Sequence, residues 1–282
     1  MSAVEVSGLR KAYDGVEAVR GIDFTIGSGE VFGLLGPNGA GKTTTVEILV
    51  GYRRRDAGEV RVLGADPARS DAGWRARIGV VPQTGELFPN LTVLEHLELF
   101  AGYYGEPRPP REVLTLVGLE EKSGAKTRTL SGGQKRRLDL GVALVGNPEL
   151  IFLDEPTTGF DPGARRAAWE TIRSLRSFGK TILLTTHYIE EAQRLADRVA
   201  VLRRGAIVAS GTPADLIAQA PATVIRYRRN GEEIVLETED PTRALHDLTD
   251  RALHDGFELE ALEVHRPTLE DVYLALTEEP RE

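Results

Sequence analysis

The sequence carries the pattern GxxxxGK[ST] at Gly36-Pro37-Asn38-Gly39-Ala40-Gly41-Lys42-Thr43, directly after the apolar run Val31–Leu35 and before a helical stretch. Glycines let a backbone wrap closely around a phosphate, and the N-terminus of the following helix supplies positive potential. Lys42 can reach β- and γ-phosphates, Thr43 offers a hydroxyl ligand for Mg²⁺, and Thr44 offers a hydroxyl to the α-phosphate region. A glycine-rich turn without a ligand is the alternative. The strand-and-helix context favours a phosphate-binding loop.

A second apolar run, Leu150–Leu153, ends in two adjacent acids, Asp154 and Glu155. Unpaired buried charge is costly, and a magnesium ion would relieve that cost at the end of a buried strand. Asp154 would hold the metal, directly or through water, and Glu155 would polarise an attacking water molecule. Taken alone, an Asp-Glu pair more often marks a solvated turn. The phosphate-binding loop favours the catalytic interpretation.

Two further polar residues follow apolar runs. His187 comes directly after Thr181–Thr186, and Gln83 follows Gly79–Pro82. Beside the same phosphates, His187 could hold the γ-phosphate and order the water together with Glu155. Gln83 could be a neutral ligand for Mg²⁺ or water. Each has an ordinary alternative, a structural histidine at a strand end or a loop amide, so neither assigns catalysis by itself.

Short apolar runs alternate with longer helical patterns along much of the chain. Val31–Leu35, Leu150–Leu153 and Ile182–Leu184 are typical of buried parallel strands, and this rhythm predicts a sheet covered by helices. Ligands of such sheets lie beyond the carboxyl ends of the strands. Val4–Leu9 and Val19–Ile26 have the polar edges of antiparallel strands. The predicted class is α/β, a P-loop NTPase core with an antiparallel β subdomain.

Two regions depart from this rhythm. Residues from about 92 to 146 lack strand signals and predict a helical insertion, with one helix beginning near Ser131. From about Ala222 onward, short strand signals precede two helical patterns, which predicts a small α+β appendage. We therefore expect a main domain over about 4–229 and an appendage over 222–282, with an uncertain boundary.

The appendage has its own start signals. Val224–Tyr227 and Ile234–Leu236 indicate strands. Asp240 followed by proline is a helix cap and first turn. A last helix is predicted to begin at Thr268, with Asp271 completing a capping-box-like pair.

Composition limits the classes of function. The chain has 282 residues, 41% of them hydrophobic and 28% charged, which is enough for one large α/β domain and a small addition. Its net charge of -8 argues against generic nucleic-acid binding. The absence of cysteine excludes disulfides and thiolate metal sites. No run approaches the roughly 18 apolar residues of a membrane span, and the start has no signal-peptide pattern. We expect a cytoplasmic protein.

The segment Leu130-Ser131-Gly132-Gly133-Gln134 joins these pieces. Residues 4 to about 229 resemble the nucleotide-binding domain of ABC ATPases, whose signature is LSGGQ. The order of the motifs also matches, from the loop at Gly36–Thr43 to Asp161 and His187. The resemblance implies ATP and Mg²⁺ as cofactors, hydrolysis of ATP, and transport through a separate transmembrane permease. The protein would then lie on the inner face of the membrane.

The resemblance also implies a head-to-tail dimer of two copies. Each ATP would be bound by the loop of one protomer and by Ser131, Gly132, Gly133 and Gln134 of the other, because a helix begins there and presents a positive dipole end. Hydrolysis would remove the γ-phosphate contact and let the two copies separate.

Two positions acquire a role from the resemblance. Tyr13 falls where the family stacks an aromatic ring on adenine, although an ordinary loop tyrosine is the alternative. Asp161 corresponds to the family's D-loop, which reaches across the dimer. Asp161 followed by Pro162 is also a good helix cap and first turn. Phe160 stands where leucine or alanine is more usual, which leaves the cross-dimer contact open.

The direction of transport is indicated by the end of the chain. The stretch Arg266–Leu274 resembles the tail of drug-exporter and sodium-exporter ATPase subunits, including the daunorubicin-resistance type, and so favours export of a drug, lipid or other small molecule. The segment from Thr84 to Asn90, with Leu87 and Phe88 beside Gln83, is together with the helical insertion a candidate docking site for a cytoplasmic element of the permease.

Other classes of ABC ATPase fit less well. DNA-repair and chromosome ATPases resemble the chain in its motifs but insert long coiled coils or zinc modules. Here about ninety residues without sustained heptads separate Lys42 from Ser131. Translation-type ATPases usually carry two cassettes in one chain. A non-hydrolysing scaffold is disfavoured by Glu155, His187 and Lys42.

Overall fold

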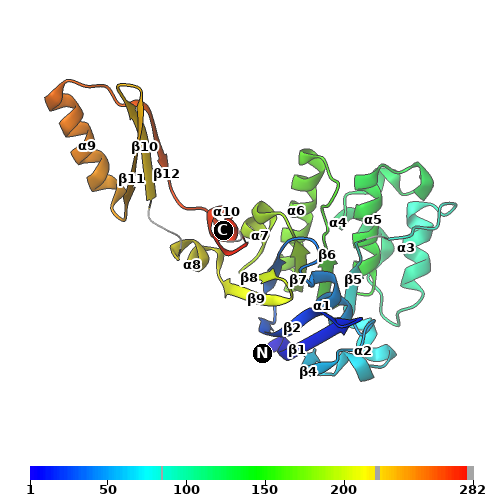
Figure 1. Ribbon diagram of the computed structural model, residues 1–282. Coiled ribbons are helices and arrows are strands. Elements are labelled where there is room, and N and C mark those ends of the chain that lie inside the picture. The colour runs from blue at the N-terminus through cyan, green and yellow to red at the C-terminus, as the bar shows by residue number, and fades with distance from the viewer. Residues whose placement is uncertain (84, 220–222, 278–282) are drawn as a thin grey trace. The chain divides into compact units, whose positions relative to one another are not determined.

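The computed structural model describes residues 1–83, 85–219 and 223–277 (Figure 1). Its fold is α/β, with a largely parallel sheet, an antiparallel β subdomain and a helical insertion, as the sequence predicts. The chain divides into two compact units, Met1–Thr212 and Pro213–Glu282. The sequence-based boundary rests on Ala222, which lies outside the described residues, so the domain extents 4–229 and 222–282 stay predictions.

The central sheet of the first unit positions the candidate site. Its strands have the order β5-β6-β7-β3-β8-β9, and all neighbours are parallel except β8 and β9. Their bounds are β3 Val31–Leu35, β5 Ile78–Val81, β6 Leu150–Asp154, β7 Thr181–Thr186, β8 Arg198–Arg203 and β9 Ala206–Gly211. Every residue of β3, β6 and β7 is buried, which explains their continuous apolar runs. Leu35 pairs with Thr186 and Asp154 with Thr185, so the loops that follow these strands meet at one edge.

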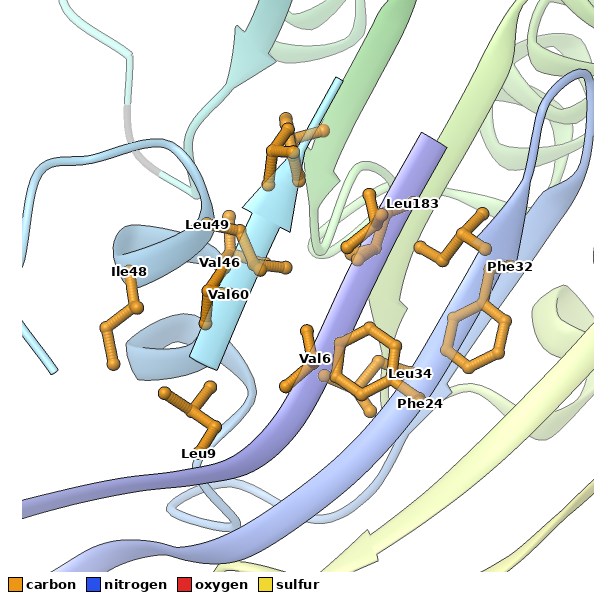
Figure 2. Close-up of a cluster of buried hydrophobic side chains, with 14 of the residues drawn as sticks. Val6, Leu9, Phe24, Phe32, Leu34, Val46, Ile48, Leu49, Val60 and Leu183 are labelled. Atoms are coloured by element: carbon orange, nitrogen blue, oxygen red, sulfur yellow. The ribbon is translucent and has the colours of Figure 1, made fainter. Parts of the chain in front are cut away.

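The antiparallel subdomain packs on the central sheet. Its strands, in the order β2-β1-β4, are β1 Ser2–Tyr13, β2 Val16–Gly27 and β4 Ala57–Val62. Figure 2 shows the cluster between the two sheets, where side chains of β1 and β2 face those of β3 and the helix α1, Lys42–Leu49. The rings of Phe24 and Phe32 are stacked with centroids 5.4 Å apart. This core fixes the two ends of the phosphate-binding loop.

The predicted helical insertion is confirmed. It contains α3 Val93–Ala101, α4 Pro110–Leu116 and α5 Gly132–Val145, with short 3₁₀ turns η2 Glu120–Lys122 and η3 Thr127–Thr129. The three helices lie side by side (Figure 1). Their buried side chains belong to a second apolar cluster. Gly141 of α5 allows close packing, because a Cβ there would lie 3.2 Å from Leu97 and 3.3 Å from Val113.

The remaining helices of the first unit connect strands. They are η1 Pro67–Arg69, α2 Ala72–Ala76, α6 Pro162–Ser177 and α7 Ile189–Leu195. The predicted cap at Asp161 is confirmed, since its Oδ1 accepts hydrogen bonds from the amides of Gly163 at 2.8 Å and Ala164 at 2.9 Å. Asp161 therefore fixes the direction in which α6 leaves the loop after β6.

The second unit is an α+β fold with its own small sheet, ordered β11-β10-β12. Its elements are α8 Pro213–Ala218, β10 Thr223–Arg229, β11 Glu232–Thr238, α9 Pro241–Asp255, β12 Glu260–His265 and α10 Leu269–Thr277. Asp240 caps α9, and Thr268 and Asp271 exchange hydrogen bonds at the start of α10, as the sequence predicts. Strand β12 was not predicted, because its residues are all exposed. In the stretches that the structure describes, no helix has the length and apolar character needed to span a bilayer.

Candidate active site

Two glycines determine the shape of the loop Gly36–Thr43. Gly41 has a φ of 105°, and a Cβ there would lie 2.4 Å from the carbonyl oxygen of Ala18. A Cβ on Gly36 would lie 2.3 Å from the carbonyl oxygen of Leu202. Larger residues would push the loop away from both neighbours. Within the described residues no side chain caps α1, so its first-turn amides remain available to an anion.

Lys42 points into the loop and not towards solvent. Its side chain is almost fully buried, and Nζ donates to the carbonyl oxygens of Gly36 at 2.8 Å and Pro37 at 3.1 Å. The same Nζ lies 3.2 Å from Oε1 of Glu155. An ammonium held among these acceptors is placed to contact a phosphate that enters the loop.

Glu155 is the residue on which the other candidates converge. Its Oε2 accepts from Nε2 of Gln83 at 3.3 Å and from Oγ1 of Thr158 at 3.0 Å. Nδ1 of His187 lies 3.2 Å from the same oxygen. Burial raises the pKa of Glu155, but the hydrogen bond and charge of Lys42, with smaller contributions from Thr158 and His187, outweigh it and lower the pKa below its usual value. The carboxylate is therefore ionised, as a base must be.

The backbone of Glu155 is strained, with a φ of 48° in the left-handed region. Thr185 holds it there, because the amide of Glu155 donates to both the carbonyl oxygen and Oγ1 of Thr185, at 3.2 and 3.0 Å. The Thr185 hydroxyl donates in turn to Oδ1 of Asp154. One threonine thus orients both acids. Thr185 is not among the residues that the sequence predicts for the site. The available signal is a hydroxyl group within a buried strand that ends directly before His187.

His187 lies against Glu155 without a formed hydrogen bond. Its Nδ1 is buried and has no hydrogen-bond partner of suitable geometry among the described residues. The ring lies 4.1 Å from that of Tyr188, and the guanidinium of Arg165 lies 4.1 Å from the Tyr188 ring. The imidazole is thereby held at the edge of the site, close to the Glu155 carboxylate.

A cleft of about 420 Å³ lies over these groups. It is lined by Tyr13, Ala18, Asn38, Gly39, Gly41, Lys42, Thr43, Thr44, Gln83 and Glu155. The Tyr13 ring has the guanidinium of Arg53 at 5.0 Å and the ammonium of Lys11 at 5.5 Å. Of the remaining loop residues, Gly36 and Pro37 bind Lys42, and the amide of Ala40 closes the turn onto the carbonyl oxygen of Pro37 at 3.2 Å.

The predicted metal ligands share an adjoining hollow. Thr43, Gln83 and Asp154 all line a space of about 190 Å³ next to the cleft. A hydroxyl, an amide oxygen and a carboxylate are oxygen donors of the kind that Mg²⁺ prefers, and Mg²⁺ at phosphate sites needs only one or two carboxylates beside waters and phosphate oxygens. The residues therefore fit a magnesium ion.

The signature residues do not line this cleft. Ser131 caps α5: its Oγ accepts from the amide of Gln134 at 3.3 Å, and its own amide donates to Oε1 of Gln134 at 3.0 Å. The side chains of Ser131 and Gln134 thus serve a capping box, a pattern that S-x-x-Q announces in sequence. Ser131 and Gly132 are exposed. Asp161 is likewise absent from the cleft lining and caps α6.

Comparison with known proteins gives close relatives. The family described as ABC transporter matches residues 19–158. The Nod factor export ATP-binding protein I of Rhizobium sp. (strain N33) is 41% identical over 300 residues, covering 98% of this chain and 97% of the relative. The protein of the same name from Paraburkholderia xenovorans (strain LB400) is 47% identical over 224 residues, covering 77% of this chain and 73% of the relative.

Solved structures resemble the chain in fold. An ATP-binding subunit of an ABC transporter superposes with a TM-score of 0.69 at 31% identity, covering 77% of this chain and 92% of that structure. A dimeric ATP-binding cassette in a post-hydrolysis state, bound to ADP and Pi, superposes with a TM-score of 0.67 at 28% identity, covering 74% and 98%. The structural match therefore spans about three quarters of the chain, whereas the first sequence relative spans nearly all of it.

Proposed function

The chain belongs to the ABC transporter family of ATP-binding proteins, and on this basis we propose that it is the ATPase subunit of an exporter with a separate membrane subunit. The chain is an ATP-hydrolysing cassette, like the neighbour solved with ADP and Pi. The observation that carries the proposal is the convergence of Lys42, Gln83 and His187 on Glu155, beside a loop shaped for phosphate.

In the proposed reaction, Glu155 polarises the attacking water, and its carboxylate is held beside the cleft by Gln83 and Thr158. Lys42 exchanges the carboxylate for phosphate oxygens when nucleotide enters the loop. His187 lies where it would orient the water or the γ-phosphate. When bound, Mg²⁺ would be held by Thr43, Asp154 and Gln83 and would neutralise phosphate charge. Tyr13, which also lines the cleft, would stack on adenine.

The proposed working unit is a head-to-tail dimer. A similar cassette is dimeric, and the signature residues of this chain lie outside its own cleft. Two exposed residues, Ser131 and Gly132, begin the capped helix α5, whose N-terminus would face the γ-phosphate bound by the partner. Because Ser131 caps the amide of Gln134, the amides of Gly132 and Gly133 would supply the contacts. Asp161 would approach the same interface.

The proposed direction is export. The relatives that match nearly the whole chain are named export ATP-binding proteins, and the end of the chain resembles exporter subunits. The second unit is shared with those relatives, because the alignment covers 98% of this chain. The cargo would be a drug, lipid or other small molecule selected by the membrane subunit.

The proposed docking site for that subunit lies at Leu87 and Phe88, beside Gln83. Thr84 of the predicted segment lies outside the described residues. Phe88 is 51% exposed, and its ring lies 5.6 Å from that of His96 and 6.5 Å from that of Phe100. A partly exposed aromatic group on the helical insertion offers apolar area to a cytoplasmic segment of the membrane subunit. The chain would thus lie on the inner face of the membrane.

Charge introduced at this surface tests the assignment. The membrane subunit that co-purifies with the chain is identified, placed in lipid vesicles with it, and assayed for ATP-driven transport. Leu87→Glu and Phe88→Glu should abolish transport and co-purification while hydrolysis by the isolated chain stays within about threefold, because a charge in an apolar contact is costly. Val208→Glu, at an apolar position that is 41% exposed on β9, is the matched control. Undiminished transport by Phe88→Glu would contradict the docking site.

A further inference from the structure

Arg136 of α5 is a partly buried cation that the reaction does not use directly. Its side chain is only 13% exposed. Nη1 donates to the carbonyl oxygen of Pro82 and, at 3.4 Å, to that of Gln83. Nη2 donates to the carbonyl oxygens of Asp154 at 2.9 Å and Glu155 at 3.3 Å, and Nε donates to that of Pro156 at 3.2 Å.

These acceptors belong to two catalytic segments that are far apart in sequence. Pro82 and Gln83 follow β5, whereas Asp154–Pro156 is the end of β6 and the turn after it. Carbonyl groups that leave a sheet need new donors. A guanidinium presents several donors in a rigid plane and can serve both segments at once, whereas an ammonium is a single compact charge. Arg136 therefore fixes the backbone positions of Gln83 and Glu155 relative to each other.

The same residue is rigidly joined to the signature. It lies on the helix that Ser131 and Gln134 begin, within the first turns of α5. The start of α5 also packs on α6, because a Cβ on Gly133 would lie 3.5 Å from that of Ala164. A shift of α5 would therefore displace the carbonyl groups of Gln83 and Glu155, because the guanidinium of Arg136 is hydrogen-bonded to both.

The neighbouring acid does not account for this placement. Asp139 lies one turn along α5, and its Oδ2 is 3.9 Å from Nη1 of Arg136, which is too far for a hydrogen bond. Burial raises the pKa of Asp139 to about 6, in spite of the opposing charge of Arg136. The guanidinium is thus directed at the catalytic backbone and not at its nearest carboxylate.

We propose that Arg136 is a positioning residue that makes the catalytic geometry of Gln83 and Glu155 depend on the position of the signature helix α5. This rests on the proposed roles of Gln83, Glu155 and the signature. When the signature of one protomer engages the nucleotide of its partner, Arg136 transmits that engagement to the protomer's own cleft. The two sites of the dimer are thereby coupled through a contact inside each chain.

Arg137 provides a matched control on the same helix. Its Nη1 donates to the carbonyl oxygen of Gly118 at 2.8 Å, within the helical insertion, with a longer contact of 3.5 Å to that of Val117. Arg136→Gln, Arg136→Lys and Arg137→Gln are compared with the wild-type chain in MgATP. For each, kcat, the Kd for ATP and the unfolding temperature are measured.

We expect kcat of Arg136→Gln to fall by about 10- to 100-fold, the usual effect of misplacing catalytic groups by about 1 Å. The Kd for ATP should change by less than about threefold, because Lys42 and the loop are untouched. Arg136→Lys keeps the charge but not the planar guanidinium, so its kcat should lie between those of wild type and Arg136→Gln. This variant tests the inference if Arg136→Gln does not fold. Arg137→Gln should keep kcat within about threefold of wild type.

A double variant separates positioning from general stability. If Arg136 acts through Glu155, then adding Arg136→Gln to Glu155→Gln should lower single-turnover hydrolysis by less than about threefold. Wild-type kcat in both Arg136 variants, equal losses in kcat and ATP affinity, or an equal loss in Arg137→Gln would overturn the inference. A wild-type chain without ATPase activity would instead contradict the proposed function itself.

Discussion

The ion pair between Lys42 and Glu155 is the central contact at the scale of single residues. Both side chains are almost fully buried, with exposed fractions of 4% and 5%. Breaking a buried pair leaves an uncompensated charge, so each group needs a replacement partner before the other leaves. In the proposed mechanism, phosphate oxygens would replace the carboxylate as partners of Lys42, while Gln83, Thr158 and His187 would remain around Glu155. Arrival of nucleotide would then free the Glu155 carboxylate from Lys42.

Lys42→Ala should weaken ATP binding by about 2–4 kcal/mol, the range expected when charge-assisted contacts to phosphate are lost. It should also raise the pKa of Glu155, because burial, which raises it, would no longer be opposed by the lysine. Calorimetric titration with ATP measures the first effect. Lys122→Ala, an exposed lysine of η2, is the control and should bind as wild type does. Equal affinities of the two variants would remove Lys42 from the phosphate site.

The sequence indicates most of the residues that lie at the site. It does not indicate the residues that hold those side chains and their backbone in place. The loop Gly36–Thr43, Gln83, Glu155 and His187 carry local patterns. Lys42, Gln83 and Glu155 line one cleft, and Nδ1 of His187 lies 3.2 Å from Oε2 of Glu155. Thr185, Thr158 and Arg136 carry no such pattern. Thr185 and Arg136 act through contacts between segments that only the folded backbone places together, whereas Thr158 contacts Glu155 from three residues further along the chain.

At the scale of elements, α5 joins the signature to strand β6 and contains an acid, Asp139, whose pKa is raised. Asp139 is buried next to Gly85, where a Cβ would lie 2.7 Å from its Oδ1. Burial raises its pKa from 3.8 to about 6. Between these values the folded chain binds more protons than the unfolded chain, so this group makes stability fall as pH rises from about 4 to 6. Below the pKa of Asp139 in the unfolded chain, the carboxyl group is protonated in both states and does not reduce stability.

Asp139→Asn should therefore flatten the pH dependence of stability. The carboxylate disfavours the fold by roughly 2–3 kcal/mol above pH 6, at about 1.4 kcal/mol per pKa unit, and the amide lacks that penalty. Urea unfolding at pH 4 and at pH 7 measures the difference, with the exposed Asp250→Asn as control. If Asp139→Asn and wild type lose equal stability between these pH values, the buried acid is not the source.

The more deeply a helix or strand is buried, the more clearly the sequence indicates it. Strands β3, β6 and β7 are buried throughout and appear in sequence as unbroken apolar runs. Helices α5, α6, α9 and α10 announce themselves by their caps at Ser131, Asp161, Asp240 and Thr268. Strand β12 lacks both signals, since Glu260–His265 is exposed and is held by backbone pairing to β10.

At the scale of the whole molecule, the proposed site residues lie on two separate surfaces of the same chain. The cleft at the carboxyl edge of the central sheet has the loop, Gln83 and Glu155, whereas the signature begins α5 outside it. One chain cannot bring both surfaces to one nucleotide without breaking the packing of α5 on the insertion and on β5. Two chains could do so in the proposed head-to-tail dimer, and the nucleotide would then be part of their interface.

This division also sets what sequence could indicate about the molecule. The motifs indicate both the phosphate-binding loop and the signature. The distance between these two in the folded chain follows from how α5 packs on α3 and α4. In the second unit, strands β10 and β11 and the Asp240 cap of α9 carry local signals in the sequence. The domain extents 4–229 and 222–282 stay predictions.

The mass of the Glu155→Gln variant in solution with MgATP tests the nucleotide-clamped dimer most directly. Loss of the base should slow hydrolysis by about 100-fold or more, so that bound ATP persists. Light scattering should then show twice the single-chain mass of 30.8 kDa, while the same variant without ATP, or with Lys42→Ala added, keeps the mass of one chain. A single-chain mass at saturating ATP, or rapid hydrolysis by Glu155→Gln, would contradict the account.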